Sequence, residues 1–224
     1  MRLLIYGMQS SGASTLAFLL AQKERCAAFV DIWAPYAAPS LQGEGDVVAK
    51  VVITTAFPIA LHRERLQPDC TILFLRHPEV NYRSLATKVY RHHCGLLEEK
   101  FAVLDAVFKA RHEYDAILYY EDMVSNPRAT LTAITQLGWS CSADFLRLER
   151  KPADIMQVNE DRYPEVVGRL EYGMGNYHGR QLSQGFAHLQ DLPEPGQEVC
   201  RWCPALTEHY HELIRTQQRW GVGT

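Results

Sequence analysis

A turn rich in glycine and serine, set between an apolar run and a helical stretch, constrains this chain more than any other feature. Leu3 to Tyr6 is a short apolar run, the turn spans Gly7 to Thr15, and Leu16 to Lys23 has helical character. Strand, glycine turn and helix in this order are the context of a phosphate-binding loop, because glycine permits the tight turn and the helix N-terminus adds partial positive charge. The sequence therefore predicts an anion site formed by Ser10, Ser11, Gly12, Ala13, Ser14 and Thr15.

The loop differs at one position from the signature of nucleoside triphosphate enzymes. Its spacing matches Gly-x-x-x-x-Gly-Lys-[Ser/Thr], except that Ala13 replaces the lysine that reaches the β- and γ-phosphates. This difference argues against an ordinary kinase or ATPase, and a P-loop kinase with an unusual loop is kept as an alternative. Another reading of the same residues is a turn of small side chains that serves tight packing of strand on helix.

Alternating apolar runs and helical stretches predict an α/β fold for the rest of the chain. Expected strands are Ala27 to Val30, Val47 to Thr54, Thr71 to Leu75 and Ala116 to Tyr120, and expected helices cover residues 79–91, 96–112, 127–137 and 205–220. Strands separated by helices predict a parallel sheet flanked by helices on both faces, of the P-loop nucleotide-binding type. Between Lys151 and Glu198 the periodicity fades, so we expect an irregular excursion there.

Length and charge limit the classes of protein that remain. The 224 residues suit a single domain, with a core over residues 1–140 and an elaboration over 141–224 that ends in a helix. A formal charge of −3 lacks the basic excess of a nucleic-acid-binding protein, and no apolar run reaches the ~18 residues that span a membrane. Six scattered cysteines favour reduced thiols in the cytoplasm. No feature of the sequence indicates an oligomeric state.

Three segments in order resemble the sulfotransferases that use 3′-phosphoadenylyl sulfate. The first is the loop itself, which resembles the family's Gly-Met-x-[Arg/Lys]-Ser-Gly-Thr-Ser. The second is a strand ending in Arg76, followed by His77-Pro78, with Ser84 eight residues beyond the arginine. The third is Tyr120-Glu121-Asp122 and the Asn126-Pro127-Arg128 that follows it. The resemblance spans about residues 1–140 and implies the family's fold.

The resemblance implies a ligand and a reaction. The loop would hold the 5′-phosphosulfate, while Arg76 and Ser84 would hold the 3′-phosphate, which agrees with the fork of donors that an arginine offers to a phosphate. The sulfonate would pass to a hydroxyl or amine of a small-molecule, carbohydrate or lipid acceptor, without a required metal. The alternative for Arg76 is a structural ion pair with Asp31 or Glu121.

The chain departs from the family at positions that carry the chemistry. Ser10 stands where the family has a lysine or arginine, and alignment through Pro58 puts Ala56 where many members have a histidine base. Lys50, four residues before the aligned segment, is a candidate for the missing cation. Candidate bases are Asp31, His62 and His77, each with a structural alternative: Asp31 as a cap or ion-pair partner, His62 on an exposed helix face, and His77 in a turn. A catalytically silent nucleotide-binding member is therefore a second hypothesis.

The remaining candidates lie in the last third of the chain. Cys200 and Cys203 have the spacing of a zinc or redox motif, but no second pair completes four ligands, so we expect no metal. Arg169 and Arg180 lie in a segment that weakly resembles the family's late Arg-Lys-Gly region, with a plain loop as the alternative. Aromatic residues in the loops 33–46 and 151–199 are candidates to line an acceptor pocket.

Overall fold

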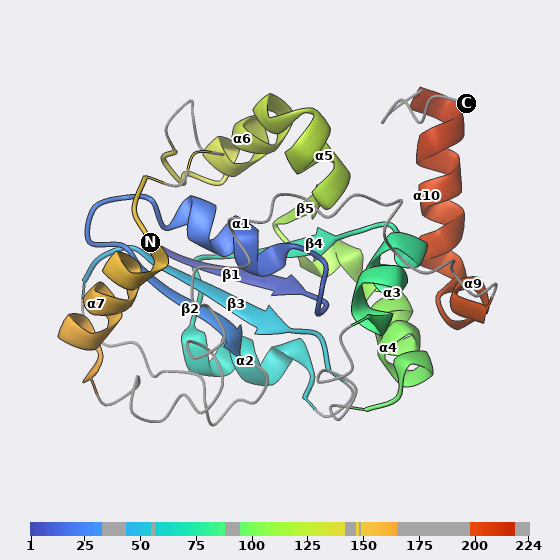
Figure 1. Cartoon of the computed structure of the whole chain (residues 1–224), viewed down its shortest axis with the longest axis horizontal. Coiled ribbons are helices and arrows are strands. Elements are labelled where there is room, and N and C mark those ends of the chain that lie inside the picture. Colours follow the sequence, from blue (N-terminus) through green and yellow to red (C-terminus); the bar gives the residue numbers. More distant parts are fainter. Residues whose placement is uncertain are drawn as a thin grey trace.

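Five parallel strands form one sheet in the order β2-β3-β1-β4-β5 (Figure 1). The computed structural model describes residues 1–32, 44–54, 57–87, 95–141, 147, 149–164 and 198–217. The strands are β1 (Arg2–Gly7), β2 (Ala27–Ile32), β3 (Val47–Val52), β4 (Cys70–Leu75) and β5 (Ala116–Tyr119). This arrangement confirms the α/β class with a parallel sheet flanked by helices.

Nine α-helices are defined within the described ranges. They are α1 (Ala13–Leu20), α2 (Ile59–Leu66), α3 (Pro78–Ala86), α4 (Leu97–Lys109), α5 (Tyr120–Ser125), α6 (Pro127–Gln136), α7 (Pro152–Arg162), α9 (Glu198–Trp202) and α10 (Pro204–Gln217). Asn126 caps α6 by accepting from the Ala129 amide at 3.4 Å, with Pro127 in the first turn, as the sequence predicts.

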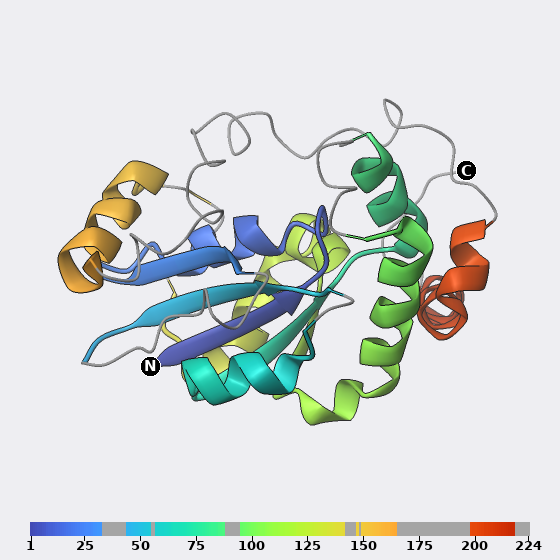
Figure 2. The same cartoon turned by 90° about the horizontal axis from the view of Figure 1, so that it is seen from below.

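Side chains alternate between the two faces of β1, and each face has its own apolar core. Leu3 and Ile5 belong to the core formed with α1, α5 and α6, whereas Leu4 and Tyr6 belong to the core formed with α2, α3, α4, α9 and α10. Figure 2 shows α4 against the sheet and the C-terminal helices outside it. Because β1 is the central strand and is buried on both faces, the loop that follows its carboxyl end lies at the middle of the sheet edge.

The expected irregular excursion is wrong at its start, because residues 152–162 form α7. The helix presents Ile155 and Asn159 to the body of the protein, both fully buried, followed by the mostly buried Tyr163. Asn159 occupies a buried position of α7, where an apolar residue would have completed the helical pattern in the sequence. Its side-chain amide donates to Ala28 O at 2.7 Å, and its Oδ1 accepts from Ala28 N at 2.9 Å. The helix therefore pairs with the outer side of the edge strand β2, which blocks that edge against other chains.

Several predicted boundaries also shift. The first helix begins at Ala13 rather than Leu16, directly after Gly12. Tyr120 starts the short helix α5 instead of ending β5, and α9 precedes the C-terminal helix, which ends at Gln217 within the described residues. The helix predicted over 96–112 ends at Lys109 and continues as a short 3₁₀ turn, η3 (Arg111–Glu113).

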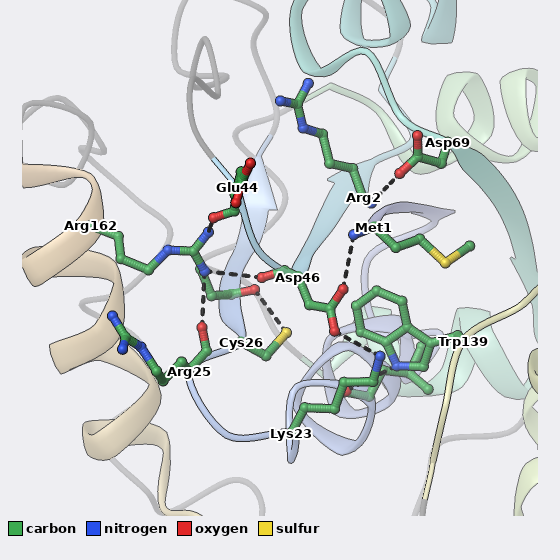
Figure 3. A network of polar contacts seen from close by, with 12 residues as sticks. Met1, Arg2, Lys23, Arg25, Cys26, Glu44, Asp46, Asp69, Trp139 and Arg162 are labelled. Carbon is green, nitrogen blue, oxygen red and sulfur yellow. Dashed lines mark hydrogen bonds and ion pairs between the residues drawn. The ribbon is translucent and has the colours of Figure 1, made fainter.

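A polar network joins the amino ends of the strands, on the edge opposite the loop (Figure 3). Asp46 accepts from the amino group of Met1 at 2.9 Å and from Lys23 Nζ at 2.8 Å, and the Lys23 ammonium lies 3.9 Å from the centre of the Trp139 ring. Arg162 of α7 donates to the backbone oxygens of Arg25, Glu44 and Asp46. The network therefore ties the turn after α1, the helix α7 and the strand starts together.

We expect the Asp46→Asn variant to be less stable and less sensitive to acid than the parent chain. Partial burial raises the pKa of Asp46, but the hydrogen bonds from Lys23 and the Met1 amine outweigh it and leave the pKa below its ordinary value. Stability from this carboxylate is therefore present above about pH 4 and is lost as the pH falls. Thermal unfolding should show a midpoint lower by about 2–4 °C at pH 7 and a shallower decline from pH 5 to 3. Glu24→Gln, which removes an exposed carboxylate, is the control; equal acid sensitivity in parent and variant would contradict this role.

Candidate functional site

The turn from β1 into α1 is held by two glycines that no larger residue could replace without a shift. A Cβ at Gly7 would lie 2.6 Å from the Cβ of Ala13, and a Cβ at Gly12 would lie 2.6 Å from the ring of Tyr120. Gly12 also has φ +92°, which L side chains rarely adopt. The loop backbone therefore approaches both the following helix and the start of α5 closely.

The loop conformation suits an anion. Ser10 has φ 62° and Gly12 φ 92°, so left-handed residues flank Ser11. Alternation of this kind directs successive backbone N–H groups to one side and forms an anion-binding concavity, to which the N-terminus of α1 adds partial positive charge. Ser11 stabilises the turn itself, because its Oγ donates to Met8 O at 2.7 Å and accepts from the Ala13 amide at 3.3 Å.

Two residues that the sequence nominated separately, Asp31 and Lys50, meet beside the first turn of α1. Asp31 Oδ1 accepts from Lys50 Nζ at 2.7 Å and from Ser14 Oγ at 3.1 Å. Lys50 is 2% exposed, and Asp31 takes the left-handed φ of 57° where the pairing of β2 with β3 becomes irregular. Thr15 lies half-buried in the same helical turn. The irregular end of β2 thus places the Asp31 carboxylate beside the loop, where it pairs with the buried Lys50 ammonium of β3.

Arg76 follows β4 directly and binds the loop. Its Nη1 donates to Ser10 O at 2.8 Å, its guanidinium carbon lies 4.2 Å from the centre of the Tyr120 ring, and its buried Nε has no hydrogen-bond partner in the described part of the chain. Burial lowers the pKa of Arg76, against the opposing effects of Tyr120, Glu121 and Tyr210. Ser84 is buried on α3, the helix that begins at Pro78 just beyond the arginine. The unsatisfied donor gives Arg76 capacity for a further acceptor.

The alternative ion pair of Arg76 with Asp31 or Glu121 does not form. Asp31 pairs with Lys50, and Glu121 has other donors: the His77 amide at 2.9 Å and the Tyr210 hydroxyl at 3.2 Å. Burial raises the pKa of Glu121, with the hydrogen bond from His77 acting in the opposite direction. Glu121 therefore supports the end of β4 through the backbone of His77 and links it to α10.

His62 does not lie on an exposed helix face, contrary to the expectation from its neighbours Arg63 and Arg65. It is fully buried on α2, and neither ring nitrogen has a hydrogen-bond partner among the described residues. Burial lowers the pKa of His62 to about 4, so the ring is neutral near pH 7. No hydrogen bond joins it to the loop or to Asp31. The nearby Arg63 and Arg65, which both follow His62, gave a misleading pattern, because His62 lies with Leu66 on the buried face of α2.

Two residues that sequence reasoning missed hold Gln9 in the loop. Asn81 Nδ2 donates to Gln9 O at 2.8 Å, and Lys100 Nζ donates to Gln9 Oε1 at 3.2 Å. Both side chains are buried, although they lie on different helices far along the chain from the loop. The segment around Arg76 and Ser84 indicated α3 as part of the site, but no sequence pattern distinguished Asn81, and nothing pointed to Lys100.

Other candidates lie outside the described residues or show no sign of a site. Ala56, Arg169 and Arg180 fall outside the described ranges, as does most of the loop from residue 33. Cys200 Sγ donates to Glu79 Oε1 at 3.4 Å and Cys203 Sγ to Val199 O. Among the residues that the structure describes, no group of histidine, cysteine and acidic side chains could hold a metal ion. No helix in the same ranges is both long and apolar enough to cross a membrane.

Comparison with known proteins finds similarity only among solved structures. No protein-family description and no curated protein sequence matches the chain. A sulfotransferase from Alicyclobacillus acidocaldarius matches over 75% of this chain and 93% of its own, with 15% identity and a TM-score of 0.42. Mouse sulfotransferase SULT7A1, complexed with PAP, matches over 96% of this chain and 85% of its own, with 11% identity and a TM-score of 0.44. The activity of this chain is therefore inferred from its own residues.

We expect the parent chain to lose stability in mild acid because of His62, and a variant without this histidine to lose much less. A histidine whose pKa falls to about 4 in the fold and rises to about 6.5 on unfolding destabilises the protein as the pH drops below 6.5. Between pH 7 and 5 the free energy of unfolding should fall by up to about 2 kcal/mol in the parent chain and much less in His62→Leu. Denaturant unfolding at both pH values measures this, with exposed His112→Gln as the control. An unchanged pH dependence in His62→Leu would refute the buried neutral state.

Proposed function

We propose that this chain binds 3′-phosphoadenylyl sulfate and transfers its sulfonate to a hydroxyl or amine of a small-molecule, carbohydrate or lipid acceptor. The observation that carries the proposal is the 2.8 Å contact from Arg76 Nη1 to Ser10 O, which fastens a buried guanidinium to the phosphate-binding loop. A ligand with one anionic group in the loop and a second at Arg76 suits this arrangement. The order and spacing of the three sequence motifs support the same ligand.

The residues present fit the two charged ends of this nucleotide. The loop amides and the N-terminus of α1 suit the 5′-phosphosulfate. The buried Nε of Arg76, which lacks a partner among the described residues, and the Ser84 hydroxyl are the groups assigned to the 3′-phosphate. When bound, 3′-phosphoadenylyl sulfate supplies a sulfonate whose bond to the bridging phosphate oxygen breaks as the acceptor atom bonds to sulfur.

Asp31 is the proposed general base. It would take the proton of the acceptor hydroxyl or amine, and it has a carboxylate fixed beside the loop by Lys50 and Ser14. Lys50 is assigned to hold this carboxylate in place, because its buried ammonium donates to the partly exposed carboxylate at 2.7 Å. His62, buried without hydrogen bonds, is not assigned a part in the reaction.

We extend the proposal to the cellular compartment of the protein and to the part of the chain that selects the acceptor. The described cysteines, Cys26, Cys70, Cys141, Cys200 and Cys203, are all free thiols, and burial raises the pKa of Cys26 and Cys203 to about 12. Unreactive free thiols support the assignment to the cytoplasm. We assign acceptor choice to the elaboration over residues 141–224 of a single domain, which includes α7 beside β2.

We expect the chain to bind 3′,5′-phosphoadenosine more tightly than ADP, and Arg76→Ala to abolish the difference. Loss of a charged hydrogen bond to the 3′-phosphate should weaken binding of 3′,5′-phosphoadenosine about 10- to 100-fold, and ADP, which shares only the loop, should be weakened much less. Isothermal titration measures both ligands, and exposed Arg128→Ala removes the same charge as a control. Equal affinity of the parent chain for the two nucleotides would contradict the proposal, and turnover of ATP with Mg²⁺ would favour the kinase alternative.

We expect Asp31→Asn to lose sulfonate transfer while it keeps nucleotide binding. Loss of a general base lowers turnover about 10²- to 10⁴-fold, as measured by transfer of labelled sulfonate to a panel of alcohols and amines. Because Asp31→Asn leaves Lys50 buried without its carboxylate partner, the double variant Asp31→Asn/Lys50→Met serves as the folding control. Full activity in Asp31→Asn would exclude the base, and absence of transfer in the parent chain across the panel would favour the catalytically silent alternative.

A further inference from the structure

The C-terminal helix α10 contacts the residue that follows Arg76, although it lies far along the chain from the three motifs within residues 1–140. Tyr210 lies near the middle of α10 and is fully buried. Its hydroxyl donates to Glu121 Oε2 at 3.2 Å, and its ring packs edge-on against that of His77, with the ring centres 5.1 Å apart. Helix α10 therefore belongs to the surroundings of Arg76.

Glu121 joins Tyr210 to the backbone beside Arg76. Oε1 of Glu121 accepts from the His77 amide at 2.9 Å, while Oε2 accepts from Tyr210. Burial and the nearby Glu121 charge raise the pKa of Tyr210, so its hydroxyl keeps its proton and remains a donor. One oxygen of the carboxylate thus holds the peptide unit between Arg76 and His77, and the other oxygen holds the buried hydroxyl of α10.

The first turn of α5 fixes both the side chain and the main chain at Arg76. Tyr120 and Glu121 are the first two residues of this helix. The centre of the Tyr120 ring lies 4.2 Å from the guanidinium carbon of Arg76, and Glu121 holds the peptide unit that follows the arginine. Because an arginine binds a phosphate best when its planar donors are aimed at the oxygens, the position of Arg76 governs the affinity.

Glu121 holds Arg76 through the main chain and not through an ion pair with its guanidinium. An ion pair would occupy the donors that a phosphate needs, whereas Arg76 keeps a buried Nε without a partner in the described part of the chain. Building on the function proposed above, we propose that Glu121 and Tyr210 are positioning residues for Arg76, so that α10 contributes to recognition of the 3′-phosphate. Neither residue touches the nucleotide in this arrangement.

The test compares two nucleotides that differ only in the 3′-phosphate, 3′,5′-phosphoadenosine and adenosine 5′-phosphate, by isothermal titration. Tyr210→Phe keeps the ring and removes the hydroxyl, and it should weaken binding of 3′,5′-phosphoadenosine about 3- to 10-fold. Glu121→Ala also frees the His77 amide and should weaken it about 10- to 30-fold. Binding of adenosine 5′-phosphate should change less than about twofold in both variants. Glu121→Gln, whose amide oxygen can accept from His77, should restore most of the affinity that Glu121→Ala loses.

A matched control on α10 separates this role from general docking of the helix. His209 precedes Tyr210, and its Nε2 forms a hydrogen bond of 2.8 Å with the Tyr119 hydroxyl of β5. His209→Phe removes that bond and leaves the Tyr210 hydroxyl in place, so it should change neither affinity by more than about twofold. If His209→Phe lowers the preference for 3′,5′-phosphoadenosine as much as Tyr210→Phe does, the specific role of Tyr210 is refuted.

The remaining outcomes distinguish this inference from the proposed function. If the parent chain prefers 3′,5′-phosphoadenosine, and Tyr210→Phe and Glu121→Ala weaken both nucleotides equally or neither, the positioning role is refuted and the proposed function stands. If the parent chain shows no preference for 3′,5′-phosphoadenosine, both are refuted. Thermal unfolding of each variant shows whether it is folded; should Glu121→Ala be unfolded, Tyr210→Phe alone decides the comparison.

Discussion

The close approach of β1 to α1 at Gly7 and Ala13 is the constraint on which the other features depend. With only 2.6 Å between the Ala13 Cβ and the place of a Cβ at Gly7, the chain turns directly from the central strand into the helix. That tight turn leaves Ser10 and Gly12 in left-handed conformations and places the loop between α1 and the end of β4. It also buries Ala13, which is 1% exposed, where a nucleoside triphosphate enzyme would carry its lysine. The cation must then come from outside the loop.

The polar side chains divide between the two edges of the sheet according to what they do. At the amino edge, Asp46, Lys23 and Arg162 join the strand starts to the turn after α1 and to α7, and their contacts are satisfied within the protein. At the carboxyl edge, Arg76 and Asn81 hold loop carbonyls while each keeps an atom without a partner among the described residues. Incomplete satisfaction is tolerable where a ligand completes it, so the carboxyl edge is the one suited to binding.

The fold could be predicted from the sequence because its signals are local. A pattern of only a few residues is enough to indicate the glycine turn, the strand before Arg76 and the Asn126-Pro127 cap. The helix α7 was missed because the buried polar Asn159 interrupts its apolar stripe, and it does so to pair with the edge of β2.

The candidate site was only partly predictable, because its contacts are long-range. Asp31 and Lys50 were both nominated, but their pairing follows from the adjacency of β2 and β3 in the sheet, which the sequence did not specify. His62 was misplaced because its burial depends on how α2 packs. Lys100 meets Gln9 only because α4 covers the sheet beside the loop, and no spacing in the sequence encodes that contact.

A crystal structure with 3′,5′-phosphoadenosine bound tests the central claim most directly. The account predicts the 5′-phosphate against the amides of residues 10–15 and the 3′-phosphate within hydrogen-bond distance of Arg76 and Ser84. A nucleotide bound with its 3′-phosphate away from Arg76, or with an empty loop, would contradict the account.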